Sequence, residues 1–288
     1  MRWNRRGRSE NLEDRRARRP RRRMARGAPL GLGGILLLLA LSFVFEQDFF
    51  ALLGSVGGVD TGAPAGEGPP PAPADLAAEE EMVQFVSFVL DDNQETWTRV
   101  FASQGNRYPA ARLVLFRDAV ESACGFAGAA SGPFYCPGDQ RVYLDLGFFD
   151  ELRRRFGAPG DFAQAYVIAH EIGHHVQNVL GIEPRVRRQQ QRRPSDANQL
   201  SVAMELQADC FAGIWGHSTA QRSILEGGDI EEGLDAAAAI GDDRIQRMAG
   251  RSINPEAFTH GSSEQRVSWF RRGLETGDPQ ACDTFGGG

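Results

Sequence analysis

The chain has 288 residues and contains arginine but no lysine, so all of its fixed positive charge is carried by guanidinium groups. Twelve arginines stand among the first 26 residues, whereas the formal net charge of the whole chain is −6, so the remainder is strongly acidic. An acidic body is a poor match for the phosphate backbone of nucleic acid, and we expect no nucleic-acid partner.

The first segment with a clear physical interpretation is residues 27–45, which carry no charge and include the run Ile-Leu-Leu-Leu-Leu. A helix needs about 20 apolar residues to cross the hydrocarbon core, so we predict a transmembrane anchor over residues 27–47. The positive-inside rule then makes residues 1–26 an Arg-rich cytoplasmic tail and puts the rest of the chain outside. A cleaved signal peptide and a buried core helix are the alternatives, although a signal peptide usually has a shorter apolar core.

Residues 48–75 are rich in Gly, Pro and Ala and are interpreted as a linker, and residues 76–288 as one globular domain. Residues 185–195, rich in arginine and glutamine, are interpreted as a mobile surface loop. Helices are expected to dominate, which gives an α+β class. The predicted helices cover residues 76–103, 148–156, 161–180, 196–215 and 230–248. The predicted strands cover residues 112–117 and 141–146.

Four cysteines occur in the domain, and their spacing suggests two bridges. Cys124 and Cys136 lie across a loop of small residues, which favours a local disulfide, and Cys210 and Cys282 would then form the second. Four cysteines allow three connectivities, and the sequence does not choose between them. Four reduced core thiols are the alternative, although an exported domain favours disulfides.

The predicted helix over residues 161–180 carries the motif His-Glu-x-x-His. His170 and His174, at positions i and i+4, project from one helix face and can share a zinc ion. Glu171 is placed to act as general base on a water molecule. Gly173 removes a side chain beside this face, so we expect another element to approach closely there.

A second helix is predicted to carry two carboxylates on one face, Glu205 and Asp209. In catalytic zinc sites with two histidines, a carboxylate commonly supplies the third protein ligand, and we assign this role to Glu205. Asp209, one turn later, can accept the free ring N–H of a histidine ligand. An arrangement with Asp209 rather than Glu205 on the metal is the alternative.

His-Glu-x-x-His followed by Glu-x-x-x-Asp is the pattern of the gluzincin metallopeptidases. The chain resembles the bacterial family called putative neutral zinc metallopeptidases, and the resemblance covers the predicted domain. The matching stretches are residues 132–137, 142–145, 170–178, 205–213 and 258–266. The resemblance implies a zincin-like fold, a Zn²⁺ cofactor and hydrolysis of peptide or protein substrates. The metzincins are excluded, because Gln177 and Leu180 replace the Gly and His of their longer motif.

The resemblance also suggests His260 as the second catalytic residue, a donor to the oxyanion of the transition state. Arg266 is a second candidate and Tyr143 a weaker one, and an ordinary surface or capping role is the alternative for His260. Residues 142–145 are either a sheet edge that pairs with substrate or an internal strand. Asp242 and its neighbour are interpreted as a solvated helix face.

Two functions follow from these patterns. The first is a zinc metallopeptidase anchored by one helix in the bacterial inner (cytoplasmic) membrane, with an extracytoplasmic catalytic domain. The second is a catalytically silent, membrane-tethered zincin-fold module for binding or assembly. Glu171 favours the enzyme, because a structural metal site has no use for a general base.

Overall fold

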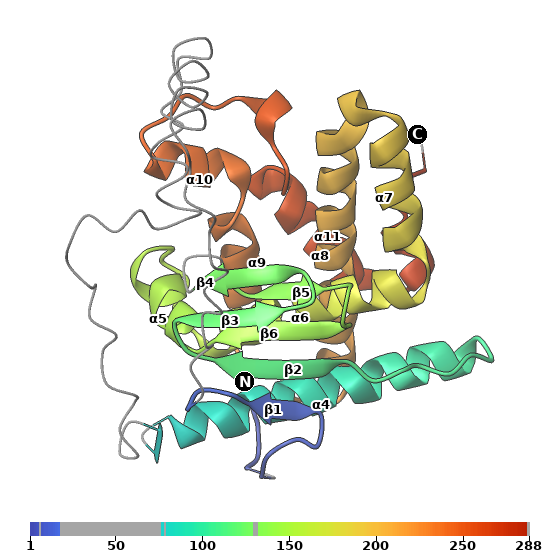
Figure 1. Ribbon diagram of the computed structural model, residues 1–288. Coiled ribbons are helices and arrows are strands. Elements are labelled where there is room, and N and C mark those ends of the chain that lie inside the picture. Colours follow the sequence, from blue (N-terminus) through green and yellow to red (C-terminus); the bar gives the residue numbers. More distant parts are fainter. Residues whose placement is uncertain (6, 18–75, 78, 129–131, 287–288) are drawn as a thin grey trace, which may run out of the picture. The chain divides into compact units, whose positions relative to one another are not determined.

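The computed structural model describes residues 1–17 and 76–286, apart from residues 6, 78 and 129–131 (Figure 1). The predicted anchor at residues 27–47 and the linker at residues 48–75 lie outside the described residues. The described chain is mostly helical with a small sheet, which confirms the α+β class.

The sheet has four strands in the order β1-β2-β6-β5. The first three are parallel, and β5 is an antiparallel edge strand. A separate hairpin is formed by β3 and β4. The strands are β1 (Leu12–Asp14), β2 (Arg112–Phe116), β3 (Ala119–Ser122), β4 (Gly125–Gly128), β5 (Phe134–Cys136) and β6 (Arg141–Asp145). Both predicted strands are found. Because β6 lies between β2 and β5, it is internal, and the edge alternative for residues 142–145 is wrong.

Both faces of β2 and β6 are buried, which explains their nearly continuous apolar sequences. On one face, alternating side chains join the main core with the helices: Leu113, Leu115, Val142 and Leu144. On the other face a smaller cluster forms with the β3–β4 hairpin: Val114, Phe116, Val120, Cys136 and Tyr143. A strand buried on both faces cannot show a strict alternation of apolar and polar residues.

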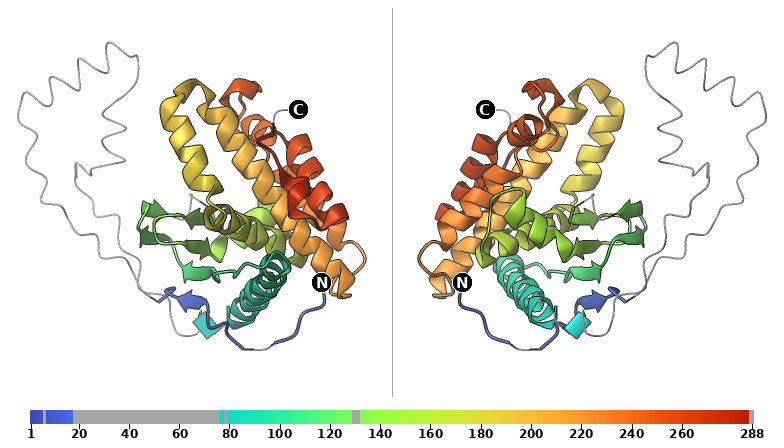
Figure 2. Two further views of the ribbon diagram at one scale, coloured as in Figure 1. Left: turned by 90° about the vertical axis from the view of Figure 1, so that its right-hand side faces the viewer. Right: turned by 90° about the vertical axis from the view of Figure 1, so that its left-hand side faces the viewer.

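The helices are α4 (Glu80–Ser103), α5 (Gly147–Arg154), α6 (Asp161–Val179), α7 (Ile182–Arg192), α8 (Ala197–Gln221), α9 (Asp229–Ala239), α10 (Asp242–Met248) and α11 (Ser263–Thr276). Figure 1 shows α4 running alongside β1 and β2, and Figure 2 shows α7, α8 and α11 gathered to one side of the strands. The α8 helix packs against α6, and α11 packs along α8. These contacts place the HExxH helix between the sheet and the C-terminal helices.

Two helical regions differ from the prediction. Residues 185–195 are largely helical, as part of α7, rather than a loop. Arginine and glutamine are good helix formers, and Pro184 falls in the first turn, where proline is tolerated. The predicted helix over residues 230–248 is split into α9 and α10 at Gly241, where a Cβ would lie 2.4 Å from the backbone nitrogen of Ser263.

Close contacts between helices depend on glycine. A Cβ on Gly173 would lie 3.0 Å from the backbone oxygen of Ala208 on α8, which confirms the close approach expected there. Between α8 and α11 the approach is closer still, because a Cβ on Gly273 would lie 1.9 Å from the backbone oxygen of Cys210. These contacts fix the distance of α8 from its two neighbours.

Both predicted disulfides are present. Cys124 pairs with Cys136 beside the sheet, and Cys210 of α8 pairs with Cys282 in the C-terminal segment. The part of the chain that the structure describes contains no free cysteine. The second bridge holds the C-terminal segment against α8.

The N-terminal segment, residues 1–17, packs on the domain. Its β1 strand extends the sheet by pairing with β2, and the Trp3 ring packs edge-on against Phe85 of α4 at 5.4 Å between centroids. The buried Arg16 guanidinium donates to Asp14 of the same segment and to Glu79, the residue before α4, at 2.7 Å.

The prediction of an Arg-rich cytoplasmic tail over residues 1–26 did not include this packing. The Met1 ammonium group lies 2.7 Å from Asp161 at the start of α6 and 3.3 Å from Asp229 at the start of α9. One membrane crossing between residues 27 and 47 would put residues 1–17 and the domain on opposite sides, so these contacts do not support a single-pass arrangement. Among the residues that the structure describes, no helix is long and apolar enough to span a membrane.

Candidate metal centre

The α6 helix brings His170 and His174 to one face, as the i, i+4 spacing requires. Their rings lie 4.8 Å apart between centroids. The face is covered by α8, whose Glu205 carboxylate reaches both rings. One oxygen lies 3.2 Å from His170 Nε2 and the other 3.5 Å from His174 Nε2.

These three residues offer donor atoms that all lie within 4.8 Å of one another. Two vertices of a tetrahedral zinc site are about 3.4 Å apart when each metal–ligand bond is about 2.1 Å. The separations between Glu205 and the two histidines are close to that value. Two imidazole nitrogens and a carboxylate oxygen are also the ligand types of catalytic zinc, so the residues present fit this metal.

Asp209 lies on the other side of His170 and is fully buried. Its Oδ1 accepts from His170 Nδ1 at 2.8 Å and from the Tyr166 hydroxyl at 2.5 Å. Arg266 of α11 donates to both oxygens of this carboxylate at 2.9 Å. Asp209 therefore contacts the ring nitrogen that faces away from Glu205, and the alternative of Asp209 as the third ligand does not match the geometry.

The buried charges shift each other's pKa values. Burial lowers the pKa of His170, but the charge of Asp209 and the hydrogen bonds to Asp209 and Glu205 together outweigh it and raise the pKa to about 10. Burial raises the pKa of Glu205, but the charges of His174 and His170 outweigh it and hold this pKa far below its usual range. The pKa of Asp209 is also lowered, because Arg266 and His170 outweigh its burial. Both carboxylates are thus held in their charged, hydrogen-bond-accepting form.

His174 is held by a neutral partner instead. Its Nδ1 lies 2.8 Å from the side-chain oxygen of Gln177, one turn further along α6. Gln177 is completely buried and donates to the backbone oxygen of Met204 at 2.7 Å. Each histidine therefore has its Nδ1 engaged and its Nε2 directed towards Glu205.

Glu171 follows the first histidine and is 8 % exposed. Within the described residues, no hydrogen bond or ion pair engages its carboxylate. Since carboxylates so deeply buried are usually paired, an unengaged one beside a metal-binding face is available to a water molecule.

His260 lies in the turn between α10 and α11, with its side chain half exposed. Its Nδ1 lies 3.2 Å from Asp242 Oδ1, and this bond, together with the charge of Glu205, raises the pKa of His260. Asp242 is buried rather than solvated, which corrects its interpretation. Asp242 Oδ2 accepts hydrogen bonds from the backbone N–H groups of Thr259, His260 and Gly261 at 2.6–3.0 Å.

The two other candidates for a catalytic donor have different roles. The Arg266 guanidinium is 2 % exposed and is committed to Asp209. Tyr143 packs on the sheet face opposite the main core, where its hydroxyl donates to Asp139 at 2.6 Å. Neither residue is free to stabilise an oxyanion beside Glu205.

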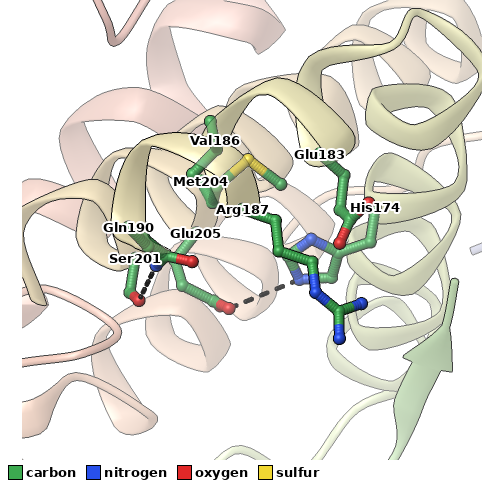
Figure 3. Close-up of a pocket in the computed structure, with 8 residues that line it drawn as sticks. All are labelled: His174, Glu183, Val186, Arg187, Gln190, Ser201, Met204 and Glu205. Atoms are coloured by element: carbon green, nitrogen blue, oxygen red, sulfur yellow. Dashed lines mark hydrogen bonds and ion pairs between the residues drawn. The ribbon is translucent and has the colours of Figure 1, made fainter. Parts of the chain in front are cut away.

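A cavity of about 280 Å³ adjoins the histidine–carboxylate cluster. Figure 3 shows Glu205 close to Gln190 and Ser201, with His174 opposite them; dashed lines mark the His174–Glu205 ion pair and the Gln190–Ser201 hydrogen bond. The lining residues come from α6, α7 and α8: His174, Glu183, Val186, Arg187, Gln190, Ser201, Met204 and Glu205. The α7 helix, predicted as a loop, therefore forms one wall of the space beside the cluster.

Four residues of the centre were not predicted, and two of them carry a sequence signal. Tyr166 precedes His170 by four positions and Gln177 follows His174 by three, so helical spacing alone puts them beside the histidines. The third is Gln207 of α8, whose side-chain oxygen accepts a hydrogen bond from the Gln177 amide at 3.1 Å, and the fourth is Asp242. These two have no comparable signal, because their partners lie far away in the sequence.

The chain is similar to one protein family and to several bacterial proteins. The model of the family described as "Putative neutral zinc metallopeptidase" matches residues 1–285. The uncharacterized protein YpfJ of Escherichia coli K12 is 46% identical over 290 residues, covering 99% of each chain. The uncharacterized protein Rv2575 of Mycobacterium tuberculosis H37Rv is 46% identical over 189 residues, 62% of this chain and 63% of the relative. No solved structure matches the chain.

Proposed function

Because the chain belongs to the putative neutral zinc metallopeptidase family, we propose that it is a zinc-dependent hydrolase of peptide bonds in peptides or proteins. The observation that supports this most directly is the convergence of His170, His174 and Glu205 beside a cavity. With Glu171 next to them, the cluster has the composition of a catalytic rather than a structural zinc site.

In this proposal His170, His174 and Glu205 hold the metal. Zinc bound there would supply Lewis-acid activation of a water molecule and of the scissile carbonyl group. Asp209 accepts a hydrogen bond from His170 Nδ1–H and so keeps Nε2 directed to the metal-binding face. In this proposal the chain is a zincin-like enzyme of the gluzincin type, because two histidines and a glutamate from a later helix would hold the metal.

Glu171 acts as general base and then as general acid. Its carboxylate takes a proton from the attacking water and delivers it to the leaving amine. The lack of any hydrogen-bond partner for it among the described residues supports this role, because a carboxylate already engaged by donors would be a weaker base.

His260 stabilises the oxyanion of the transition state. Asp242 holds its backbone and its Nδ1, which leaves Nε2 free to donate and favours the protonated ring. A donor aimed at the developing oxyanion contributes about 3–4 kcal/mol to catalysis. Asp242 is then a positioning residue that acts through His260.

The two disulfides indicate the cellular compartment of the domain. Two bridges are typical of an oxidising compartment, which supports an extracytoplasmic domain. Since residues 1–17 pack on that domain, we place them in the same compartment. The predicted anchor at residues 27–47 stays a prediction.

A catalytically silent zincin-fold module for binding or assembly is the second candidate. It would keep the metal-binding cluster without turnover. The Glu171 carboxylate, which no donor engages in the described part of the chain, argues against it. Zinc content and cleavage of a broad peptide library, measured on the full chain, separate the two functions.

We expect stoichiometric zinc and peptide cleavage in the wild type. In Glu171→Gln we expect zinc to be retained while kcat falls by at least 100-fold, because general acid–base catalysis contributes about 10²–10⁴. Glu151→Gln, on the exposed side of α5, is the matched control and should cleave normally. A wild type that holds zinc but cleaves nothing in the library would favour the silent module.

A further inference from the structure

The buried partner of His174 fixes which of its ring nitrogens carries the proton. The Gln177 amide group donates to the backbone oxygen of Met204 at 2.7 Å, and a carbonyl oxygen can only accept. This bond requires the amide nitrogen of Gln177 to face Met204, and therefore its oxygen to face His174 Nδ1. Since an amide oxygen can only accept, Nδ1 carries the proton and Nε2 keeps its lone pair for a metal.

A second buried glutamine extends this arrangement. The side-chain oxygen of Gln207, on α8, accepts from the Gln177 amide nitrogen at 3.1 Å. The Gln207 amide nitrogen donates to the backbone oxygen of Cys282 at 2.9 Å. Here too the acceptor is a carbonyl, so the orientation of Gln207 is fixed. His174 is therefore connected to the C-terminal segment by a hydrogen-bonded chain with one allowed direction.

The C-terminal end of this chain is clamped to α8. Cys282 forms its disulfide with Cys210, three residues after Gln207 on the same helix. Two residues beyond Cys282, the Thr284 hydroxyl donates to the backbone oxygen of Ala203 at 2.6 Å. The Cys282 carbonyl is thus held in place on both sides, although residues 278–284 contain only a short 3-10 turn.

We propose that the disulfide-held C-terminal segment, residues 278–284, is a positioning element of the metal centre. It acts through Gln207 and Gln177, which hold His174 in the orientation and tautomer that bind zinc. This inference rests on the proposed function, because it assigns His174 to the metal. His170 and His174 are then held by different partners. His170 contacts the charged Asp209 of α8, which Arg266 of α11 supports, whereas His174 contacts neutral amides that lead to the C-terminal segment.

Zinc affinity, measured by chelator competition on the full chain, tests the proposal. Gln207→Leu nearly keeps the side-chain volume but removes the hydrogen bonds that connect Gln177 to Cys282. We expect its zinc Kd to rise by roughly tenfold, which is the lower end of the loss of metal affinity seen when a hydrogen-bond partner of a zinc ligand is removed. Gln280→Leu is the matched control, since Gln280 lies in the same segment with an exposed side chain, and its Kd should not change.

A purely structural role of Gln207 would lower the Tm of the zinc-free protein without changing the zinc Kd. We therefore measure both quantities for each variant. The disulfide variant Cys210→Ser/Cys282→Ser should also raise the Kd, and combining it with Gln207→Leu should add little, because both changes break the same connection.

Two results would overturn the proposal in different ways. An unchanged Kd in Gln207→Leu, or fully additive effects of the glutamine and disulfide variants, would overturn the inference while leaving the proposed function intact. Failure of the unsubstituted chain to bind zinc would overturn the proposed function, and the inference with it.

Discussion

The two histidines of the metal centre differ in the partners that hold them. His170 donates to Asp209, whose charge is balanced by Arg266, whereas His174 donates to the neutral Gln177. A carboxylate partner raises the basicity of a histidine ligand and an amide mainly orients it. The centre therefore combines one strongly polarised ligand with one that is held chiefly by geometry.

The buried Asp242 carboxylate gives a prediction about acid stability. Burial raises its pKa, but the hydrogen bonds from His260 and from the turn's backbone N–H groups outweigh this, so the pKa is lowered from 3.8. A carboxyl group with a lowered pKa stabilises the folded state above its unfolded pKa, and this contribution disappears as the pH falls through the folded value.

We therefore expect Asp242→Asn to have a lower unfolding free energy than the wild type at pH 6, by about 1–3 kcal/mol. The difference should start to shrink below about pH 4, where the carboxyl of the unfolded chain becomes protonated, and should shrink further as the pH approaches the lower pKa of the folded state. Urea unfolding at pH 6 and pH 3 measures it, with the exposed Asp235→Asn as control. A difference that stays the same at both pH values would contradict the assignment of the charged form.

Much of the centre is predictable at the residue scale, because helical spacing fixes which side chains share a face. The i, i+4 pairs on α6 and α8 suffice to group His170 with His174, and Glu205 with Asp209. The sequence does not show which carboxylate faces Nε2 and which faces Nδ1, since that depends on how α8 crosses α6. Gln207 and Asp242 likewise acquire their roles from the positions of the C-terminal segment and of the turn before α11.

At the scale of elements, the successful predictions are those with a clear apolar pattern and the failures are those without one. The HExxH helix and the two buried strands were found close to their true bounds. The α7 helix was missed because its sequence is almost entirely polar, and the α11 helix was not predicted. The α11 boundaries do carry local signals, a capping box at Ser262 and Gln265 and a left-handed Gly277.

The close packing of α8 and α11 gives the second prediction. A Cβ at Gly273 would lie 1.9 Å from the backbone oxygen of Cys210, and neither backbone can move without displacing a helix. We expect Gly273→Ala to lower the unfolding free energy by about 1–3 kcal/mol or more. It should also weaken zinc binding, because α11 carries Arg266.

Gly227→Ala is the matched control for this variant, since a Cβ there meets nothing within 4 Å. We expect its stability and zinc affinity to equal those of the wild type. Urea unfolding and chelator competition measure the two quantities. A Gly273→Ala protein as stable as the control would show that the helices do not approach as closely as the structure has them.

At the scale of the whole molecule, the N-terminal segment changes the interpretation of the charge pattern. Arginines before an apolar run predict a cytoplasmic tail when only composition is considered. In the structure several of these guanidinium groups are paired with carboxylates at the start of α4, as in the contacts of Arg8 with Glu80 and of Arg16 with Glu79, the residue before the helix. Composition cannot distinguish a positive charge that orients a helix in a membrane from one that is paired in a fold.

The packing of residues 1–17 predicts that both ends of the described chain lie on the same side of the membrane. Asn4→Cys and Glu275→Cys place one added thiol in the N-terminal segment and one on α11, both at exposed positions. With a membrane-impermeant maleimide on intact cells, we expect the two variants to be labelled to the same extent, whether fully or not at all. Permeabilised cells, in which both thiols are reachable, provide the control. Labelling of Glu275→Cys without labelling of Asn4→Cys would support a single membrane crossing at residues 27–47. In that case β1 could not pair with β2 in the cell.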